Sequence, residues 1–96
     1  MIHRFCIEDE AHAEPQTEHE TLEGAIAELE RRALLPWNEE PNLAPCTGWR
    51  NCSRRYEIVE YDTSARPWKC LRRFPALEVG AKGVVWDADI LRKCGA

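Results

Sequence analysis

No complete signature of catalysis or cofactor binding can be recognised in the sequence. There is no Gly-x-Ser-x-Gly nucleophile turn, no glycine-rich phosphate loop ending in lysine and serine or threonine, and no dinucleotide-binding glycine pattern. The histidines that could serve as a base for a nucleophile are confined to the first fifth of the chain, at His3, His12 and His19. We therefore predict a protein with no enzymatic activity, no catalytic residue and no cofactor.

A basic and apolar leader is also missing, as is any apolar run long enough to span a membrane. The first acidic residue, Glu8, follows after only seven positions. Cysteine occurs five times, and an odd number without a leader argues against a closed extracellular disulfide framework. We expect a cytoplasmic protein with reduced thiols and no membrane partner.

The chain has 96 residues, enough for one domain with a single modest core and too few for two. Its net charge of −4 conceals a polarity. Residues 1–40 carry eleven acids and three bases, whereas residues 41–96 carry six acids and ten bases. This asymmetry favours self-association or an anionic partner at one pole, and the alternative is that the two parts neutralise each other within the fold.

A strand is predicted at the start of the chain. Residues 3–7 alternate, with His3, Phe5 and Ile7 on one face, which is typical of a half-buried strand. Residues 8–20 are acidic and polar and are interrupted by a proline, so we expect a solvated loop there. The carboxylates and imidazoles of this loop could hold a divalent cation, but their spacing matches no known metal-binding loop, and we predict no metal site.

One amphipathic helix is predicted after this loop. Thr17 and Thr21 are alternative N-caps, and Pro36 ends the helix near residue 35. Glu28 and Arg32 stand four positions apart in the favourable order for an ion pair. The apolar stripe that would pack on a sheet consists of Leu22, Ala25, Ile26, Leu29 and Ala33.

The second half of the chain predicts a strand meander. Residues 37–45 are rich in proline, which favours an extended connection. Residues 87–94 are expected to form a short helix or a frayed end. Strands are expected over residues 55–61, 68–73, 75–79 and 84–86, with turns at 62–67 and 80–83.

The predicted fold class is α+β, in a single domain that spans residues 1–96. An N-terminal strand and one amphipathic helix precede a three- to four-stranded antiparallel meander, and the helix lies on one face of the sheet. If the other face exposes Tyr61, Trp68 or Phe74, that face is expected to be a dimer interface or a ligand platform.

Cys46 and Cys52 are the best candidates for thiol chemistry. They flank a turn-like segment with the spacing Cys-x5-Cys, which is wider than the pairs of structural zinc sites and lacks a second pair. A reversible disulfide between them is one alternative, and ordinary packing is the other. Catalysis would need a histidine beside a thiol, as would be the case if His3 faced Cys70 on a neighbouring strand, but a packing role for such a histidine is more common.

Arginines alternate with aromatic residues in the second half of the chain, a mixture that suits phosphate binding and base stacking. The acidic net charge argues against a nucleic-acid partner, and Glu57, Glu60 and Asp62 lie among the arginines as intramolecular partners. The candidate binding residues are Trp49, Arg50, Arg54, Arg55, Tyr61, Trp68, Arg72 and Arg73.

The pattern PCTxWRxCxRxYEIVEYD, which starts at Pro45, continues with PWxxLRR from Pro67 and LEV from Leu77. These motifs, together with the residues around them, cover about half of the chain, and they resemble a group of small uncharacterised bacterial proteins. The resemblance implies a bacterial origin and assigns no activity to any residue. Arg55 and Cys70 depart from the pattern.

Three functional hypotheses follow. The first is a small non-enzymatic binding protein that holds a protein partner or a second copy of itself, as a homodimer, through the exposed sheet face and the segment from Trp49 to Arg55. The second is a module that binds anions or nucleic acid with Arg50, Arg54, Arg55, Arg72 and Arg73. The third is a thiol-dependent redox protein that uses Cys46 and Cys52.

Overall fold

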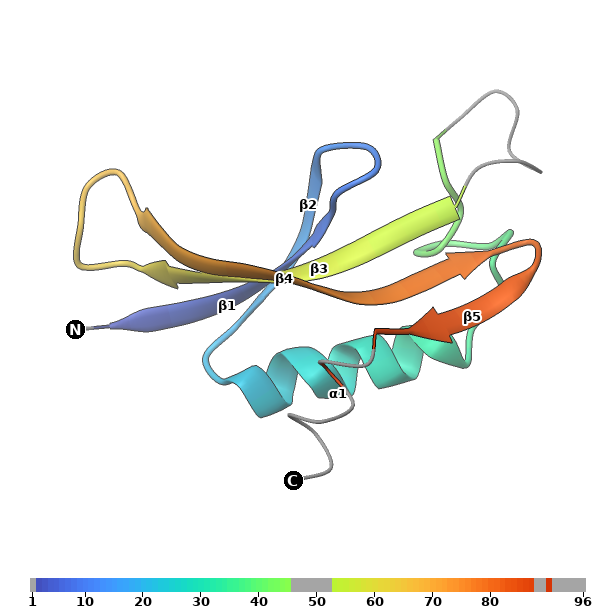
Figure 1. Ribbon diagram of the computed structural model, residues 1–96, viewed down its shortest axis with the longest axis horizontal. Helices are drawn as coiled ribbons and strands as arrows, with labels where there is room; N and C mark the ends of the chain where they lie inside the picture. Colours follow the sequence, from blue (N-terminus) through green and yellow to red (C-terminus); the bar gives the residue numbers. More distant parts are fainter. Residues whose placement is uncertain (1, 46–52, 88–89, 91–96) are drawn as a thin grey trace.

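The computed structural model describes residues 2–45, 53–87 and 90 of the chain. Within these residues, five strands form one antiparallel sheet and one helix packs on it, which confirms the α+β class (Figure 1). The order of the strands across the sheet is β2-β1-β3-β4-β5. The elements are β1 (His3–Asp9), β2 (Glu14–His19), α1 (Leu22–Ala33), β3 (Ser53–Asp62), β4 (Lys69–Gly80) and β5 (Gly83–Trp86).

The prediction of a solvated loop at residues 8–20 is wrong, because β1 and β2 form a hairpin. β1 continues to Asp9, and β2 pairs with it antiparallel, with a register shift between Ile7 and Glu8. β2 lies at the edge of the sheet, where a strand needs hydrogen bonds on one side only. Pro15 and a series of polar residues are therefore tolerated in a strand that shows little apolar alternation.

The predicted helix is confirmed, and Thr21 is its N-cap. The Thr21 hydroxyl accepts a hydrogen bond from the backbone N–H of Gly24 at 3.0 Å. Thr17, the other candidate cap, lies in β2. The Nε of Arg32 donates to Glu28 at 2.7 Å, as the spacing predicts. The apolar stripe faces the sheet, and its buried members are Ala25, Ile26 and Leu29.

The segment after the helix differs from the extended connection predicted for it. Residues 37–42 form turns, and the side chain of Asn42 is buried. Its amide nitrogen donates to the carbonyl of Arg32 at 2.8 Å and to that of Leu35 at 3.2 Å. The last carbonyls of a helix have no partner within the helix, so a buried amide at this position satisfies them and fixes the path of the chain.

The two strands predicted at residues 68–73 and 75–79 are one long strand, β4. Pro75 lies inside it, opposite Glu57 of β3, in the part that β5 does not reach. Because β5 does not pair with this part of β4, the missing N–H of Pro75 removes no hydrogen bond to β5. Two register shifts between β3 and β4 accommodate the extra residues of β4. The meander of β3, β4 and β5 is thereby confirmed.

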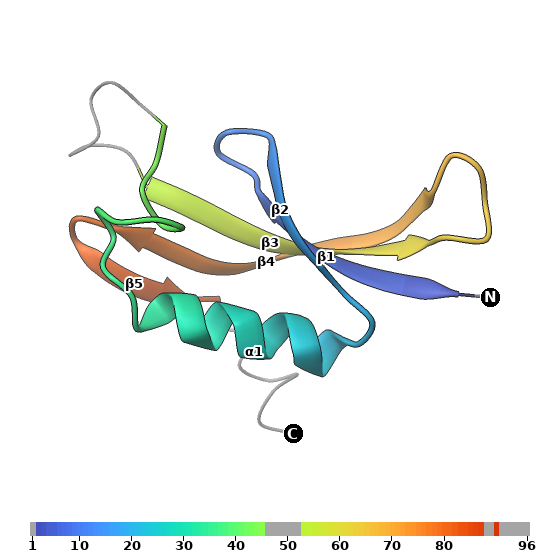
Figure 2. The same cartoon turned by 180° about the vertical axis from the view of Figure 1, so that it is seen from behind.

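The core lies between α1 and one face of the sheet. Ile7 of β1, Ile58 of β3 and Leu77 of β4 are buried there with Leu29 of the helix. Figures 1 and 2 show that the turn between β3 and β4 reaches past the N-terminal end of α1. Among the described residues, no helix covers the opposite face of the sheet, and none is long and apolar enough to cross a bilayer.

Candidate functional site

A groove of about 540 Å³ lies on the sheet face opposite α1. Cys6 is opposite Val59 in the pairing of β1 with β3, and opposite Glu18 in the pairing of β1 with β2. Side chains alternate between the two faces of a sheet, and Ile7, the residue after Cys6, faces the core. Cys6, Val59 and Glu18 therefore point to the face opposite α1. The groove is lined by Cys6, Ile7, Glu8, Pro15, Gln16, Thr17, Glu18, Tyr61, Pro67 and Trp68.

Two aromatic rings form one wall of this groove. Trp68 is 40% exposed, and its ring centroid lies 5.9 Å from that of Tyr61 at an interplanar angle of 52°. The hydroxyl of Tyr61 donates to Oε2 of Glu8 at 2.6 Å. Burial, followed by this hydrogen bond, raises the pKa of Tyr61 well above its ordinary value. The phenol therefore stays protonated, and the hydrogen bond fixes the ring that supports Trp68.

The groove is acidic. Its lining contains two carboxylates, Glu8 and Glu18, and no basic side chain. The thiol of Cys6 shows the effect of this charge, because its pKa is raised to about 11, first by burial and then by the charges of Glu18 and Glu8. A positive charge in the groove is therefore favoured over a negative one.

Tyr61 and Trp68 are the predicted site residues that the groove brings together. The predicted arginines instead bind carboxylates of the same chain. Arg72 contacts Glu60 at 2.5 Å, and Arg73 forms an ion pair with Glu57. The Nε of Arg55 lies 4.0 Å from Glu10, and Arg54 is buried. Trp49, Arg50, Cys46 and Cys52 lie outside the residues that the structure describes.

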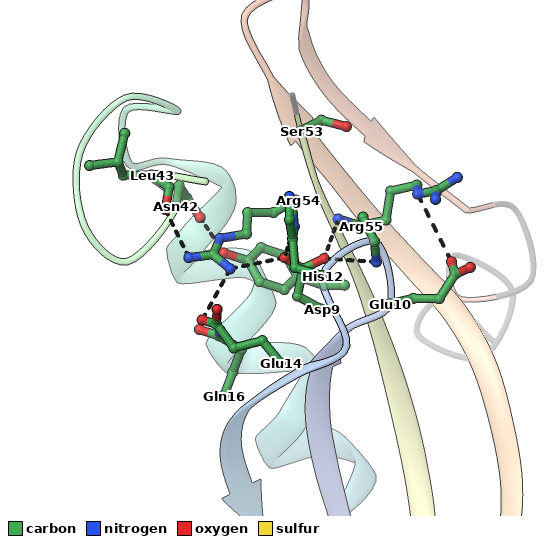
Figure 3. Close-up of polar contacts among 12 residues, drawn as sticks. Asp9, Glu10, His12, Glu14, Gln16, Asn42, Leu43, Ser53, Arg54 and Arg55 are labelled. Carbon is green, nitrogen blue, oxygen red and sulfur yellow. Dashed lines mark hydrogen bonds and ion pairs between the residues drawn. The ribbon is translucent and has the colours of Figure 1, made fainter. Parts of the chain in front are cut away.

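Arg54 is the centre of a second group of polar residues (Figure 3). One of its terminal nitrogens, Nη1, donates to Oδ2 of Asp9 at 2.9 Å and to Glu14 at 3.1 Å. The other, Nη2, donates to the carbonyl of Leu43 at 2.8 Å. The guanidinium thus joins β3 to the hairpin of β1 and β2 and to the segment before residue 46.

Asp9 is completely buried and accepts four hydrogen bonds. Besides Arg54, its donors are the backbone N–H groups of Ala11 and Arg55, at 3.0 and 3.2 Å. Nδ1 of His12 contacts Oδ2 of Asp9 at 2.6 Å. These bonds hold the turn between β1 and β2 in place, so the role that the contacts support is structural.

The divalent-cation alternative for residues 8–20 finds no support in this geometry. Asp9 and Glu14 are bound to Arg54, and no group of three or more potential metal ligands occurs among residues 2–45, 53–87 and 90. A sequence signal for the Asp9 contact did exist. Asp9 has the same parity as Ile7, so a strand continued to residue 9 points its carboxylate toward the core, where it requires a partner.

The pairing of His3 with Cys70 is not formed. Cys70 is exposed and lies opposite Tyr61, whereas His3 lies opposite Asp62, the next residue of β3. Adjacent residues of a strand point to opposite faces, so the two side chains are on different sides of the sheet. Nδ1 of His3 contacts Glu60 at 2.5 Å.

Loss of stability at acidic pH is expected from Asp9. Burial alone raises the pKa of Asp9, but hydrogen bonds from Arg54 and His12 outweigh burial and hold the pKa below its ordinary value. The contribution of Asp9 to the free energy of unfolding is therefore complete above the pKa of an unfolded aspartate, about 3.9, and is lost as the pH falls through the lower pKa of the folded state.

Urea unfolding of wild type and of Asp9→Asn, measured at several pH values from about 5 down to about 2, tests this expectation. The variant should lose less stability per pH unit than wild type, even though it is less stable throughout. Glu30→Gln, at an exposed position of α1, is the matched control and should keep the wild-type slope. Equal slopes in all three proteins would contradict the role of Asp9.

Comparison with protein-family models, with curated proteins and with solved structures finds no match for this chain. The resemblance to small bacterial proteins therefore stays a prediction from the sequence.

Proposed function

We propose that this chain is a small non-enzymatic binding protein that holds a segment of another protein in the groove on its open sheet face. The observation that carries the proposal is the half-exposed ring of Trp68, which rests against Tyr61 at the wall of a groove of about 540 Å³. Tryptophan and tyrosine are enriched among the residues that dominate binding energy at protein interfaces, where a rigid ring fills space at little entropic cost.

The anion-binding alternative receives less support. A phosphate-binding surface needs arginines whose charge is available, yet Arg54, Arg72 and Arg73 each form ion pairs with carboxylates of the same chain. An incoming phosphate would have to compete with Asp9, Glu60 and Glu57 for these guanidinium groups. The groove, by contrast, offers exposed aromatic surface that needs no such exchange.

The redox alternative rests on Cys46 and Cys52, which lie outside the described residues. Cys6 and Cys70 are free thiols, and the raised pKa of Cys6 makes it a weak nucleophile. Binding through the groove is therefore the function that the described residues favour.

Selection of random peptides displayed on phage, with the purified chain as the target, tests the proposal. Enriched peptides should bind Trp68→Ala at least tenfold more weakly than wild type, because truncation of a central aromatic residue commonly costs about 2 kcal/mol or more. Leu34→Ala removes an apolar side chain that is 88% exposed and outside the groove, and should bind as wild type does.

Far-ultraviolet circular dichroism of each variant establishes that the fold is retained. Peptides that bind Trp68→Ala and wild type equally would contradict the proposal. Light scattering coupled to size exclusion, at low and high salt, covers self-association as the other occupant. A dimer that Trp68→Ala dissociates would make the partner a second copy of the chain.

A further inference from the structure

We propose that the groove receives an arginine side chain from a basic segment of the partner protein, with its guanidinium stacked on Trp68 and paired with the carboxylate of Glu18. This inference rests on the proposed function and specifies the chemistry of the partner. It is carried by three features of the groove: its charge, its aromatic wall and an available carboxylate.

Glu18 supplies the available carboxylate. Within the described residues it forms no ion pair, its side chain is exposed, and it lines the groove from the edge strand β2. The other acid of the lining, Glu8, already accepts from the hydroxyl of Tyr61 at 2.6 Å and lies 3.5 Å from Arg73. A cation that enters the groove therefore meets one carboxylate without a counterion and a second one that is partly neutralised.

Trp68 supplies a surface on which a cation can stack. The face of an indole attracts cations through its quadrupole more strongly than the faces of the other aromatic side chains. A planar guanidinium stacks on such a face while its edge donates two parallel hydrogen bonds to a carboxylate, whereas an ammonium group acts as a point charge. A groove that has both partners in its lining thus fits arginine better than lysine.

The charge of the surrounding chain favours the same partner. The hairpin of β1 and β2 supplies most of the lining of the groove, and residues 3–19 carry five acids and one base. A field of this sign attracts a basic segment from a distance and repels acidic and phosphorylated ones. An uncharged apolar segment would bury Glu18 without a partner, which is unfavourable. The charge of this hairpin therefore favours a basic partner at the groove.

The experiment uses peptides selected for binding that depends on Trp68. We expect them to contain arginine, and replacement of that arginine by norleucine should weaken binding about tenfold. Glu18→Gln should cause a loss of similar size for the arginine peptide and almost none for the norleucine peptide, which is the signature of a direct pair in a double-mutant cycle. Both effects should shrink at high salt.

Glu30→Gln removes one exposed acid from α1, outside the groove, and is the matched control for net charge. It should leave both affinities near those of wild type. Peptides that depend on Trp68 but contain no base, or arginine peptides that bind Glu18→Gln as well as wild type, would overturn this inference and leave the proposed function standing. If no selected peptide depends on Trp68, the inference and the proposed function both fail.

Discussion

Replacing Arg54 with methionine is expected to lower the free energy of unfolding by about 3–5 kcal/mol, because the substitution leaves a buried carboxylate without its cation. Asp9 is fully buried, and Arg54 is only 4% exposed. Without the guanidinium, Asp9 keeps its contacts with two backbone N–H groups and with His12, but these do not replace a full positive charge. A loss of this size is a large fraction of the roughly 5–15 kcal/mol by which such domains are stable.

Urea unfolding followed by tryptophan fluorescence measures the loss. Arg55→Met is the matched control, since it removes the same charge from the neighbouring residue, which is exposed and forms an ion pair of only 4.0 Å. Its effect should stay within about 0.5 kcal/mol of zero. Equal stabilities of the two variants would show that the Arg54 contacts do not support the fold. Asp9→Asn combined with Arg54→Met should recover part of the loss, because no charge is then left buried.

Much of the fold could be predicted because the relevant elements have dense apolar periodicity. The helix places Ala25, Ile26 and Leu29 on one face, and β3 contains Ile58 and Val59, which are residue types that favour strands. β2 could not be found in this way. Its side chains are mostly polar, and only its position at the sheet edge, beside an already formed β1, makes the extended conformation favourable.

Only part of the candidate site can be predicted from the sequence. The sequence points to Tyr61, Trp68 and Phe74 because a helix can cover only one face of a small sheet, so aromatic residues on the other face remain accessible. The expectation is wrong for Phe74, which packs against the core beneath the helix face of the sheet. Glu18, which gives the groove its available charge, falls within residues 8–20, for which the sequence predicts a loop. Its contribution depends on the register that places it opposite Cys6, and register is a property of the assembled sheet.

The role of the arginines cannot be predicted from the sequence. Arginines interleaved with aromatic residues are equally compatible with a phosphate-binding surface and with intramolecular ion pairs. Pairing of β3 with β4 decides between the two, because it sets Glu60 opposite Arg72 and brings Glu57 within reach of Arg73. The ion pairs between acids of β3 and bases of β4 then stabilise the hairpin as cross-strand pairs.

Cys6 is expected to react with iodoacetamide about a hundredfold more slowly in the folded protein than in the unfolded chain at about pH 8. The thiolate is the reactive species, and the pKa of Cys6 is raised to about 11 in the folded state, first by burial and then by Glu18 and Glu8. Cys70 is exposed and serves as the internal control, since it should be labelled readily in both states. Peptide mapping by mass spectrometry after timed labelling gives the rate at each cysteine.

Glu18→Gln provides the sharper form of this test, because it changes the charge of the groove and leaves the Cys6 side chain in place. Glu18 is the largest electrostatic cause of the raised pKa of Cys6, so its neutralisation should speed the labelling of Cys6. The rate at Cys70 should not change, and Glu30→Gln should alter neither rate. If Cys6 reacts in the folded protein as fast as in the unfolded chain, the part of the groove that Cys6 lines is neither buried nor acidic. A cation would then gain no electrostatic stabilisation in the groove.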